Sequence, residues 1–434
     1  MTFQDAPAAQ IALAEAAAQA AVPAVHAPVR PARFVGDSRT LWRLLLRGAM
    51  LLAVTLGIYR FWLATDVRRF LWSNTVIAGE GLEYNGTAVE LLIGFLIAIA
   101  LLLPINLMLF VLALGMGPVG EFASVLGFPI LFVLGQFAIF RARRYRLTRT
   151  VLRGVRFHQT GSAWLYALRA TSWWILIVLT LGLAYPFAQA SLERYKMRHT
   201  HYGDLPGRFE GSGFSLFWRG LLMWFLVIAP FAMGIIAVVT AVDWDGLNEA
   251  MIGGDQTMAG VIMSDGFWAA IGLGVTGVAA SILFAVLLFP IFQAMLLRWR
   301  LSGLRFGEIS VRSQLLKRRI YGAYGRFLLY AFLFTLLAGL VAAVGLLMVG
   351  ALSSSPVGIG SEIAGVVAGV AFYVIMMLGY STIYQATVKL ALWRHGVNSM
   401  EIDNLAVLER VKATGQPSSA VGEGLADALN IGGI

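Results

Sequence analysis

Two histidines placed two residues apart form the most chemically suggestive short motif in the chain. His199 and His201 lie near Glu193 and Asp204 in a polar stretch of an otherwise apolar sequence. Two imidazoles at this spacing can share a metal ion on extended backbone, but they diverge on a helix. The sequence has no cysteine and no HExxH pattern, so we interpret them as interfacial histidines. We predict no metal site, no cofactor and no catalytic residue, and hence no enzyme.

Four glutamines are better candidates for a functional site, because polar side chains are unfavourable inside a bilayer and are therefore rare there. Each lies near the end of an apolar segment, with a basic residue four or five positions later. They are Gln136, Gln189, Gln293 and Gln385. Pro186 and Pro290 precede two of them by three residues and free backbone carbonyls one turn earlier. The glutamines either join helices by hydrogen bonds or line a polar vestibule of the kind found in transporters.

Membrane helices must position these side chains. Of the 434 residues, 59% are hydrophobic and 13% are charged, too little charge for the surface of a soluble protein. Apolar runs longer than about 18 residues can cross a bilayer core, where backbone groups must pair within their own segment. We predict eight helical segments, at about 41–63, 89–114, 119–140, 168–187, 216–242, 267–297, 327–352 and 363–392.

The charge of the connecting segments sets their orientation. Residues 141–156 hold seven arginines and no acid, and residues 298–326 hold eight bases and one acid. Residues 243–265 hold five acids and no base. Because cytoplasmic loops carry an excess of Lys and Arg, the first two segments are expected in the cytosol and the third outside. Both termini are expected in the cytosol.

Segments 41–63 and 168–187 do not fit this orientation as full crossings, since each would connect cytosol to cytosol. Both carry arginine near their start, and both end in similar strings, TLGIYRF and TLGLAYPF. We expect them to be re-entrant or to lie in the interface. The alternative is eight full crossings, with one basic loop on the wrong side.

Similar strings recur along the chain. PFAQASLER (186–194) matches PIFQAMLLR (290–298), and each is followed by a basic, aromatic-bearing turn. Stretches 75–84, 148–157 and 200–209 have the Thr, Val and aromatic content of strands. We therefore predict an all-α polytopic membrane protein, a helical bundle built from internal repeats with short β elements packed together on its cytosolic face. The predicted units are a disordered tail 1–35, repeats 36–160 and 161–297, a partial repeat 298–410 and a tail 411–434.

Several of these strings resemble one family. The strings that carry the resemblance are TLGIYRFW (55–62), RRFLWSNTVIAGEGLEYNGTAVELLIG (68–94), FEGSGFSLFWRG (209–220) and EGLADALNIGGI (423–434). In this order along the chain, they are similar to sequences of the YjgN family (DUF898) of bacterial inner-membrane proteins. The resemblance implies an integral cytoplasmic-membrane protein. It brings neither a catalytic residue nor a substrate.

The chain has a formal charge of +10, and its basic residues lie beside the apolar runs. This arrangement favours an anionic membrane surface over nucleic acid as the binding partner. We therefore expect a non-enzymatic structural or interaction protein whose partners are the bilayer and anionic lipid headgroups at the cytosolic face. The alternative function is a transporter or pore for a small polar or ionic solute, with the glutamines along its path.

Overall fold

The computed structural model describes residues 32–114, 118–242, 244–253, 265–352, 359–415 and 419–429. Most of the predicted tail 1–35 lies outside this range. Within that predicted tail, Ala32–Phe34 form strand β1, so this part of it is structured rather than disordered.

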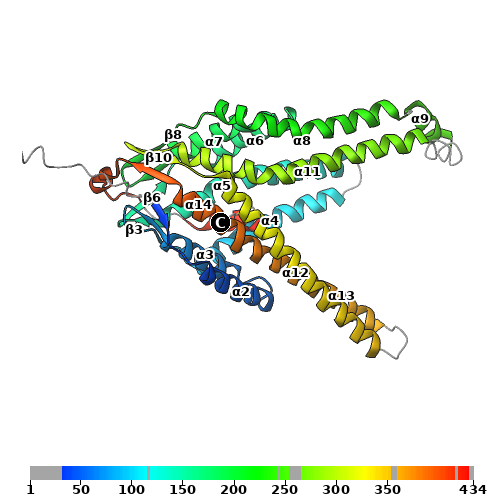
Figure 1. Ribbon diagram of the computed structural model, residues 1–434, viewed down its shortest axis with the longest axis horizontal. Helices are drawn as coiled ribbons and strands as arrows, with labels where there is room; N and C mark the ends of the chain where they lie inside the picture. The colour runs from blue at the N-terminus through cyan, green and yellow to red at the C-terminus, as the bar shows by residue number, and fades with distance from the viewer. Residues whose placement is uncertain are drawn as a thin grey trace, which may run out of the picture.

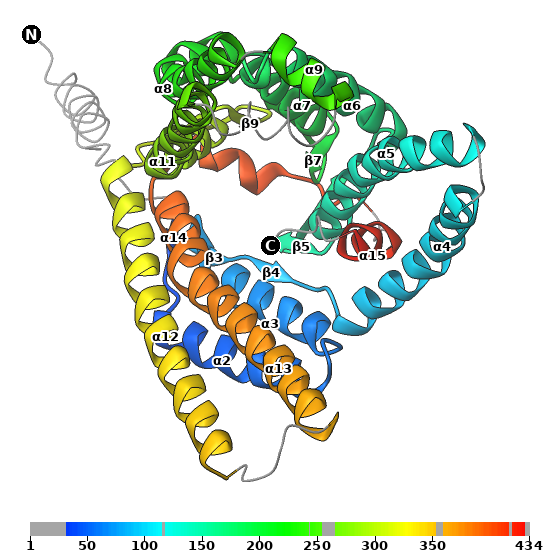
Figure 2. The ribbon, with the colours of Figure 1, turned by 90° about the vertical axis from the view of Figure 1, so that its right-hand side faces the viewer.

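The described helices form five successive hairpins arranged around a common centre (Figure 2). The hairpins are α2 (Ser38–Val54) with α3 (Arg60–Ser73), α4 (Ala88–Leu114) with α5 (Pro118–Thr148), α6 (Ala163–Leu179) with α7 (Tyr185–Arg198), α8 (Gly213–Ala241) with α11 (Asp265–Ser302), and α12 (Lys317–Leu352) with α13 (Ile359–Tyr384). Helix α13 continues through a π-helical turn, Gln385–Lys389, into α14 (Leu390–Asn398). Neighbouring hairpins contact one another, and α13 contacts α2, which closes the ring.

Five helical stretches among the described residues are long and apolar enough to cross a membrane. They are Ala88–Leu112, Gly213–Thr240, Gly266–Ser302, Lys317–Gly345 and Gly365–Asn398. The hairpins α8/α11 and α12/α13 diverge from the end of the molecule that carries the strands, the sheet end (Figure 1). Helix α9 (Trp244–Gly253) lies at the opposite end.

Neither segment 41–63 nor segment 168–187 is one continuous helix. Helix α2 stops at Val54, where Leu56 and Gly57 adopt positive φ and turn the chain back into α3. Leu181 and Gly182 do the same between α6 and α7. Each of these short hairpins is preceded and followed by a strand of the sheet end. The chain therefore enters and leaves both segments at the sheet end, which is the geometry that a non-crossing segment requires.

The strands form a curled antiparallel meander. A three-stranded sheet has the order β1-β2-β3, and an eight-stranded sheet runs from β4 to β11 in chain order, with β11 next to β1. Their bounds are β2 Thr75–Ile77, β3 Glu80–Gly81, β4 Glu83–Tyr84, β5 Thr150–Leu152, β6 Val155–Gln159, β7 Thr200–Tyr202, β8 Leu205–Phe209, β9 Leu304–Phe306, β10 Ile309–Ser313 and β11 Met400–Asp403.

The predicted β stretches 75–84, 148–157 and 200–209 are strands, and they pair with one another through β4–β5 and β6–β7. The fold is mostly helical, as predicted, but its β part is larger than the short elements that were expected, because β9, β10 and β11 extend these pieces into an eight-stranded sheet. Strands of two to five residues are too short for an alternating pattern to be read reliably. Their turns give a better signal: Arg153 and Gly154 both have positive φ, as a two-residue hairpin turn requires.

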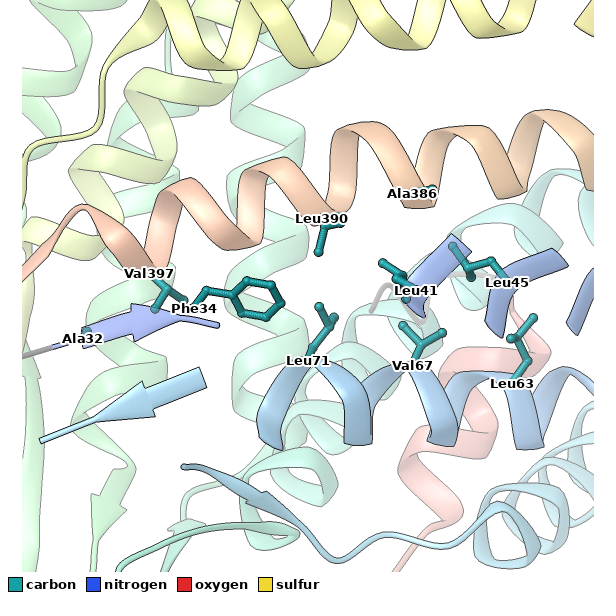
Figure 3. Close-up of a cluster of buried hydrophobic side chains, with 10 residues drawn as sticks. All are labelled: Ala32, Phe34, Leu41, Leu45, Leu63, Val67, Leu71, Ala386, Leu390 and Val397. Carbon is teal, nitrogen blue, oxygen red and sulfur yellow. The ribbon is translucent and has the colours of Figure 1, made fainter. Parts of the chain in front are cut away.

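A cluster of buried side chains joins the two ends of the ring. Phe34 of β1 lies between residues of α2, α3 and α14, and its N–H donates to Asn398 Oδ1 at 2.7 Å. Figure 3 shows the cluster, which consists of Ala32, Phe34, Leu41, Leu45, Leu63, Val67, Leu71, Ala386, Leu390 and Val397. Segments more than 300 residues apart in sequence thus share one core.

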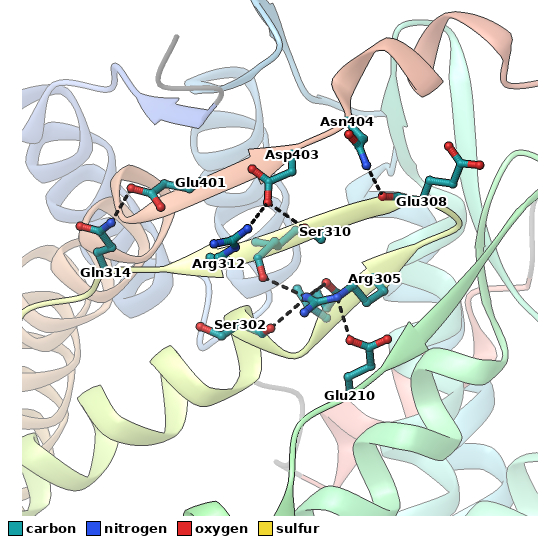
Figure 4. A network of polar contacts seen from close by, with 12 residues as sticks. Glu210, Ser302, Arg305, Glu308, Ser310, Arg312, Gln314, Glu401, Asp403 and Asn404 are labelled. Carbon is teal, nitrogen blue, oxygen red and sulfur yellow. Dashed lines mark hydrogen bonds and ion pairs between the residues drawn. The ribbon is translucent and has the colours of Figure 1, made fainter. Parts of the chain in front are cut away.

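Polar contacts fix the register of the last strands (Figure 4). Arg305 pairs with Glu210 at 2.9 Å, and Arg312 pairs with Asp403 at 3.1 Å. Gln314 Nε2 donates to Glu401 Oε1 at 2.6 Å. Exposed ion pairs contribute little free energy, so their main effect is to specify which residues of β8 to β11 face each other.

Candidate functional site

Charged side chains gather inside the ring, near the sheet end, around the buried carboxylate of Glu193. Glu193 and Lys196 lie on consecutive turns of α7, and Arg300 lies in the last turn of α11. Lys196 Nζ is 2.6 Å from Glu193 Oε1, and Arg300 Nε is 3.3 Å from the same oxygen. We call Glu193, Lys196 and Arg300 the central ion cluster. It ties α7 to α11 through one buried carboxylate.

Burial and neighbouring charge shift the pKa values of this cluster. Burial lowers the pKa of Lys196 from 10.5 to about 8, although Glu193 opposes the shift. Burial would raise the pKa of Glu193, but Lys196, Arg300 and Arg143 outweigh it and hold that pKa below the usual range. The carboxylate is therefore charged at neutral pH and is balanced by the cations around it.

A cavity of about 530 Å³ lies beside the central ion cluster. Its polar lining includes Gln293, Arg300, Tyr384 and Lys389, from α11, α13 and the π-helical turn. The rest of its wall is mainly apolar and includes Leu71 of α3. The cavity therefore offers a few hydrogen-bonding groups in a mostly apolar space, an arrangement typical of small-molecule sites.

The structure brings two of the four predicted glutamines to this place. Gln293 lines the cavity, and Gln189 Oε1 accepts a hydrogen bond from Arg300 Nη2 at 2.8 Å. Gln385 begins the π-helical turn and donates to Ser381 Oγ at 3.2 Å, and Gln136 lies on α5. Neither Gln385 nor Gln136 is among the described residues that line the cavity.

The C-terminal part of the chain supplies residues that sequence reasoning missed. A 3-10 helix, Leu405–Arg410, follows β11, and the chain then reaches helix α15 (Val421–Ala428), which packs against α4 and α5 within the ring (Figure 2). The backbones of α15 and α4 are in direct contact at Gly424 and Gly94. A side chain at Gly424 would therefore collide with Gly94. Range 411–434 was expected only to be a tail.

A buried ion pair holds α15 in place. Glu423 pairs with Arg68 of α3, and both side chains are about 5% exposed or less. Arg68 Nη1 also donates to Tyr84 Oη at 3.2 Å, and Arg146 Nε of α5 lies 3.9 Å from Glu423 Oε2. The carboxylate of Glu423 and the hydroxyl of Tyr84 together raise the pKa of Arg68 despite its burial. The sequence contains one signal for α15, which is Glu423 at the start of EGLADALN. A carboxylate is stabilised in the first turn of a helix by the helix dipole, so it indicates a helix start.

The histidines are arranged differently from a metal site. His201 lies on β7 directly opposite His158 of β6, and the two rings stack 4.9 Å apart. Burial and the neighbouring His201 lower the pKa of His158. Within the described part of the chain, no group of three His, Asp or Glu side chains could hold a metal ion.

The ring interior is thus suited to binding and to holding helices together. Its carboxylates, Glu193 and Glu423, are engaged in ion pairs. Arg68 Nε and Arg143 Nη1 are buried donors that have no hydrogen-bond partner among the described residues. Buried donors of this kind favour water or an anionic group.

Comparison with known proteins gives one positive finding about family. A model described as "Bacterial protein of unknown function (DUF898)" matches residues 29–428. Neither the curated proteins nor the solved structures include a significant match.

Proposed function

This chain belongs to the DUF898 family of bacterial proteins of unknown function, and from that premise we propose a non-enzymatic membrane interaction protein. It is integral to the bacterial cytoplasmic membrane, and its sheet end faces the cytosol. Its basic cytosolic side engages anionic lipid headgroups.

An exposed stripe of arginines on α2 carries this proposal. Arg39, Arg43 and Arg47 recur every four residues on the exposed side of the helix, opposite the buried Leu41 and Leu45. Basic residues on one face of an amphipathic helix are attracted to anionic lipid.

The tip of the same hairpin is apolar and exposed. Met50 is 70% exposed, Val54 80% and Leu56 93%. Only about seven residues, or roughly 10 Å of helix, separate Arg47 from the end of α2. The tip can therefore enter the hydrocarbon while the arginines stay at the phosphates, since the whole core is about 30 Å thick.

The orientation follows from where the basic segments lie. Segment 141–156 covers the end of α5 with β5 and the start of β6, and segment 298–326 covers the end of α11 with β9, β10 and the start of α12. Both are at the sheet end, while the acidic α9 region lies opposite. The positive-inside rule then favours a cytosolic sheet end.

The order of elements supports internal repeats as part of the proposal. A helix hairpin followed by strands recurs after α3, α5, α7, α11 and α14. We propose that this succession reflects repeats with the units 36–160, 161–297 and 298–410.

Thermal unfolding in lipid nanodiscs tests the proposed function. The wild type is expected to melt at higher temperature in nanodiscs containing phosphatidylglycerol than in purely zwitterionic ones, and high salt should reduce the difference. The variant Arg39→Gln/Arg43→Gln/Arg47→Gln should lose most of the difference. A control variant with the same charge loss at the sheet, Arg153→Gln/Arg208→Gln/Arg312→Gln, should keep it. Equal melting of the wild type in both lipids would refute lipid engagement.

Transport of a small polar solute is the second candidate function. The cavity beside the central ion cluster favours it, because Gln293 and Lys389 line a space large enough for such a solute. Flux of ions and metabolites into liposomes that contain the protein tests this candidate. Flux that Gln293→Leu abolishes would make transport the leading function.

A further inference from the structure

A small polar pocket between α2, α12 and α14 lies apart from the cavity in the ring interior. Its volume is about 170 Å³. Each of the three helices contributes polar or aromatic groups to the wall. The residues that carry the argument are Ser38, Trp42, Arg326, Tyr330, Arg394 and His395. None of the described residues that line the pocket carries a carboxylate.

One base of this pocket, Arg394, is held in position by two neighbouring oxygen atoms. Arg394 Nη2 donates to Gly36 O at 2.9 Å and to Ser38 Oγ at 3.0 Å. The nearby carboxylate of Asp37 is engaged as the N-cap of α2 and accepts from Thr40 N–H at 3.3 Å. His395 Nδ1 is buried and has no hydrogen-bond partner among the described residues. The pocket therefore combines fixed positive charge with an unused polar atom.

The exposed surface around the pocket is basic on one side and apolar on the other. Lys317, Arg318 and Arg319 in the first turn of α12 are exposed, as is the arginine stripe of α2. Farther along α12 the exposed side chains are apolar, with Leu329 53% and Phe332 61% exposed. An occupant that matches both sides has an anionic head and an apolar tail.

We propose that this pocket binds the phosphate of an anionic phospholipid, whose acyl chains lie along the exposed apolar faces of α12 and α2. The inference rests on the proposed function and assigns a specific lipid site within it. Phosphate oxygens accept from the guanidinium of Arg326 and from His395 when Nδ1 carries the proton. The small volume admits a headgroup and leaves the chains in the bilayer.

Native mass spectrometry of the purified full chain, titrated with phosphatidylglycerol or phosphatidylcholine, tests the site. The wild type is expected to retain one phosphatidylglycerol more tightly than phosphatidylcholine. Arg326→Gln should weaken this retention about tenfold, the effect commonly carried by one hydrogen bond to a charged group. Arg208→Gln, which removes an exposed base of β8 outside both the pocket and the arginine stripe of α2, should leave it unchanged, and Arg326→Lys should restore part of it. His395→Phe tests the pocket a second time if Arg326→Gln misfolds.

Equal retention of phosphatidylglycerol by the wild type, Arg326→Gln and His395→Phe would overturn the site. Displacement of the lipid by glycerol phosphate at equal concentration would overturn the lipid assignment in favour of a free phosphate. The nanodisc measurement separates the two proposals. If phosphatidylglycerol stabilises the wild type in nanodiscs but Arg326→Gln and His395→Phe retain the lipid in native mass spectra as the wild type does, the pocket proposal fails and the proposed function stands. If phosphatidylglycerol does not stabilise the wild type in nanodiscs, the proposed function itself fails.

Discussion

At the scale of single residues, the charges that organise the ring interior are paired, and the pairs Arg300–Glu193 and Arg68–Glu423 join helices far apart in sequence. Arg68 and Glu423 are separated by 355 positions, and each is buried because the other is present. A sequence shows that such residues exist but not which of them meet. The glutamine pattern led to Gln189 and Gln293 near the cavity. Arg300, which donates to Gln189 and lines the cavity together with Gln293, was read only as part of a basic loop.

Replacing one partner of the Arg68–Glu423 pair should destabilise the protein more than replacing both partners by apolar side chains. Glu423→Gln leaves a buried guanidinium without its carboxylate, and a loss of about 3 kcal/mol in the free energy of unfolding is expected. The double variant Arg68→Met/Glu423→Leu should lose less than the sum of Arg68→Met and Glu423→Leu. Melting temperatures in one detergent, arranged as a double-mutant cycle, measure this. Additive losses would show that the two side chains act independently.

Lys196 should make stability depend on pH. Its pKa is lowered from 10.5 to about 8 by burial, so between these values the unfolded chain binds more protons than the folded one. The free energy of unfolding then rises with pH across this window. The melting temperature of the wild type relative to Lys196→Met should therefore increase from pH 7.5 to pH 10. Lys317→Met, at an exposed lysine, should show no such trend, and a flat difference for Lys196→Met would contradict the assignment.

At the scale of elements, hydropathy located the long helices well but did not distinguish a spanning helix from a short hairpin. Segments 41–63 and 168–187 are apolar enough to suggest helices, and only the turns at Leu56 and Leu181 show that each reverses. Gly365 and Gly369 have the GxxxG spacing of a close-packing motif, yet they face open space, whereas Gly234, Gly274 and Gly277 form the close contact between α8 and α11. Small-residue spacing identifies a face that permits close approach, and the partner helix decides which face is used.

Docking of α15 should depend on the absence of a side chain at Gly424. In Gly424→Leu, the new side chain would collide with the backbone of Gly94 and Phe95, so α15 should leave its place. A cysteine replacing the buried Leu425 should then react with a thiol reagent. It should stay protected in Gly365→Leu, where a side chain meets open space. The chain has no native cysteine to interfere. Protection of the cysteine in Gly424→Leu would mean that α15 tolerates the collision.

At the scale of the whole molecule, the fold is a ring closed twice, once by helix hairpins and once by the meander beneath them. Local sequence predicted the first strands and most helices, because turns and apolar runs are local signals. Closure could not be predicted, because it depends on contacts such as Phe34 with Asn398 that join the first and last elements. The C-terminal helix inside the ring was missed for the same reason.

The central claim is that every strand lies on one side of the membrane and that the two short hairpins do not cross it. The test uses single cysteines at the exposed positions Glu80, Asp204 and Glu308, which lie in the strand hairpins that follow α3, α7 and α11. A cysteine at Asn248 of α9 is the comparison. In spheroplasts treated with a membrane-impermeant maleimide, only the Asn248 cysteine is expected to react, and all four should react after permeabilisation. Labelling of the Glu80 or Asp204 cysteine in sealed spheroplasts would contradict the account, because it would place part of the sheet outside.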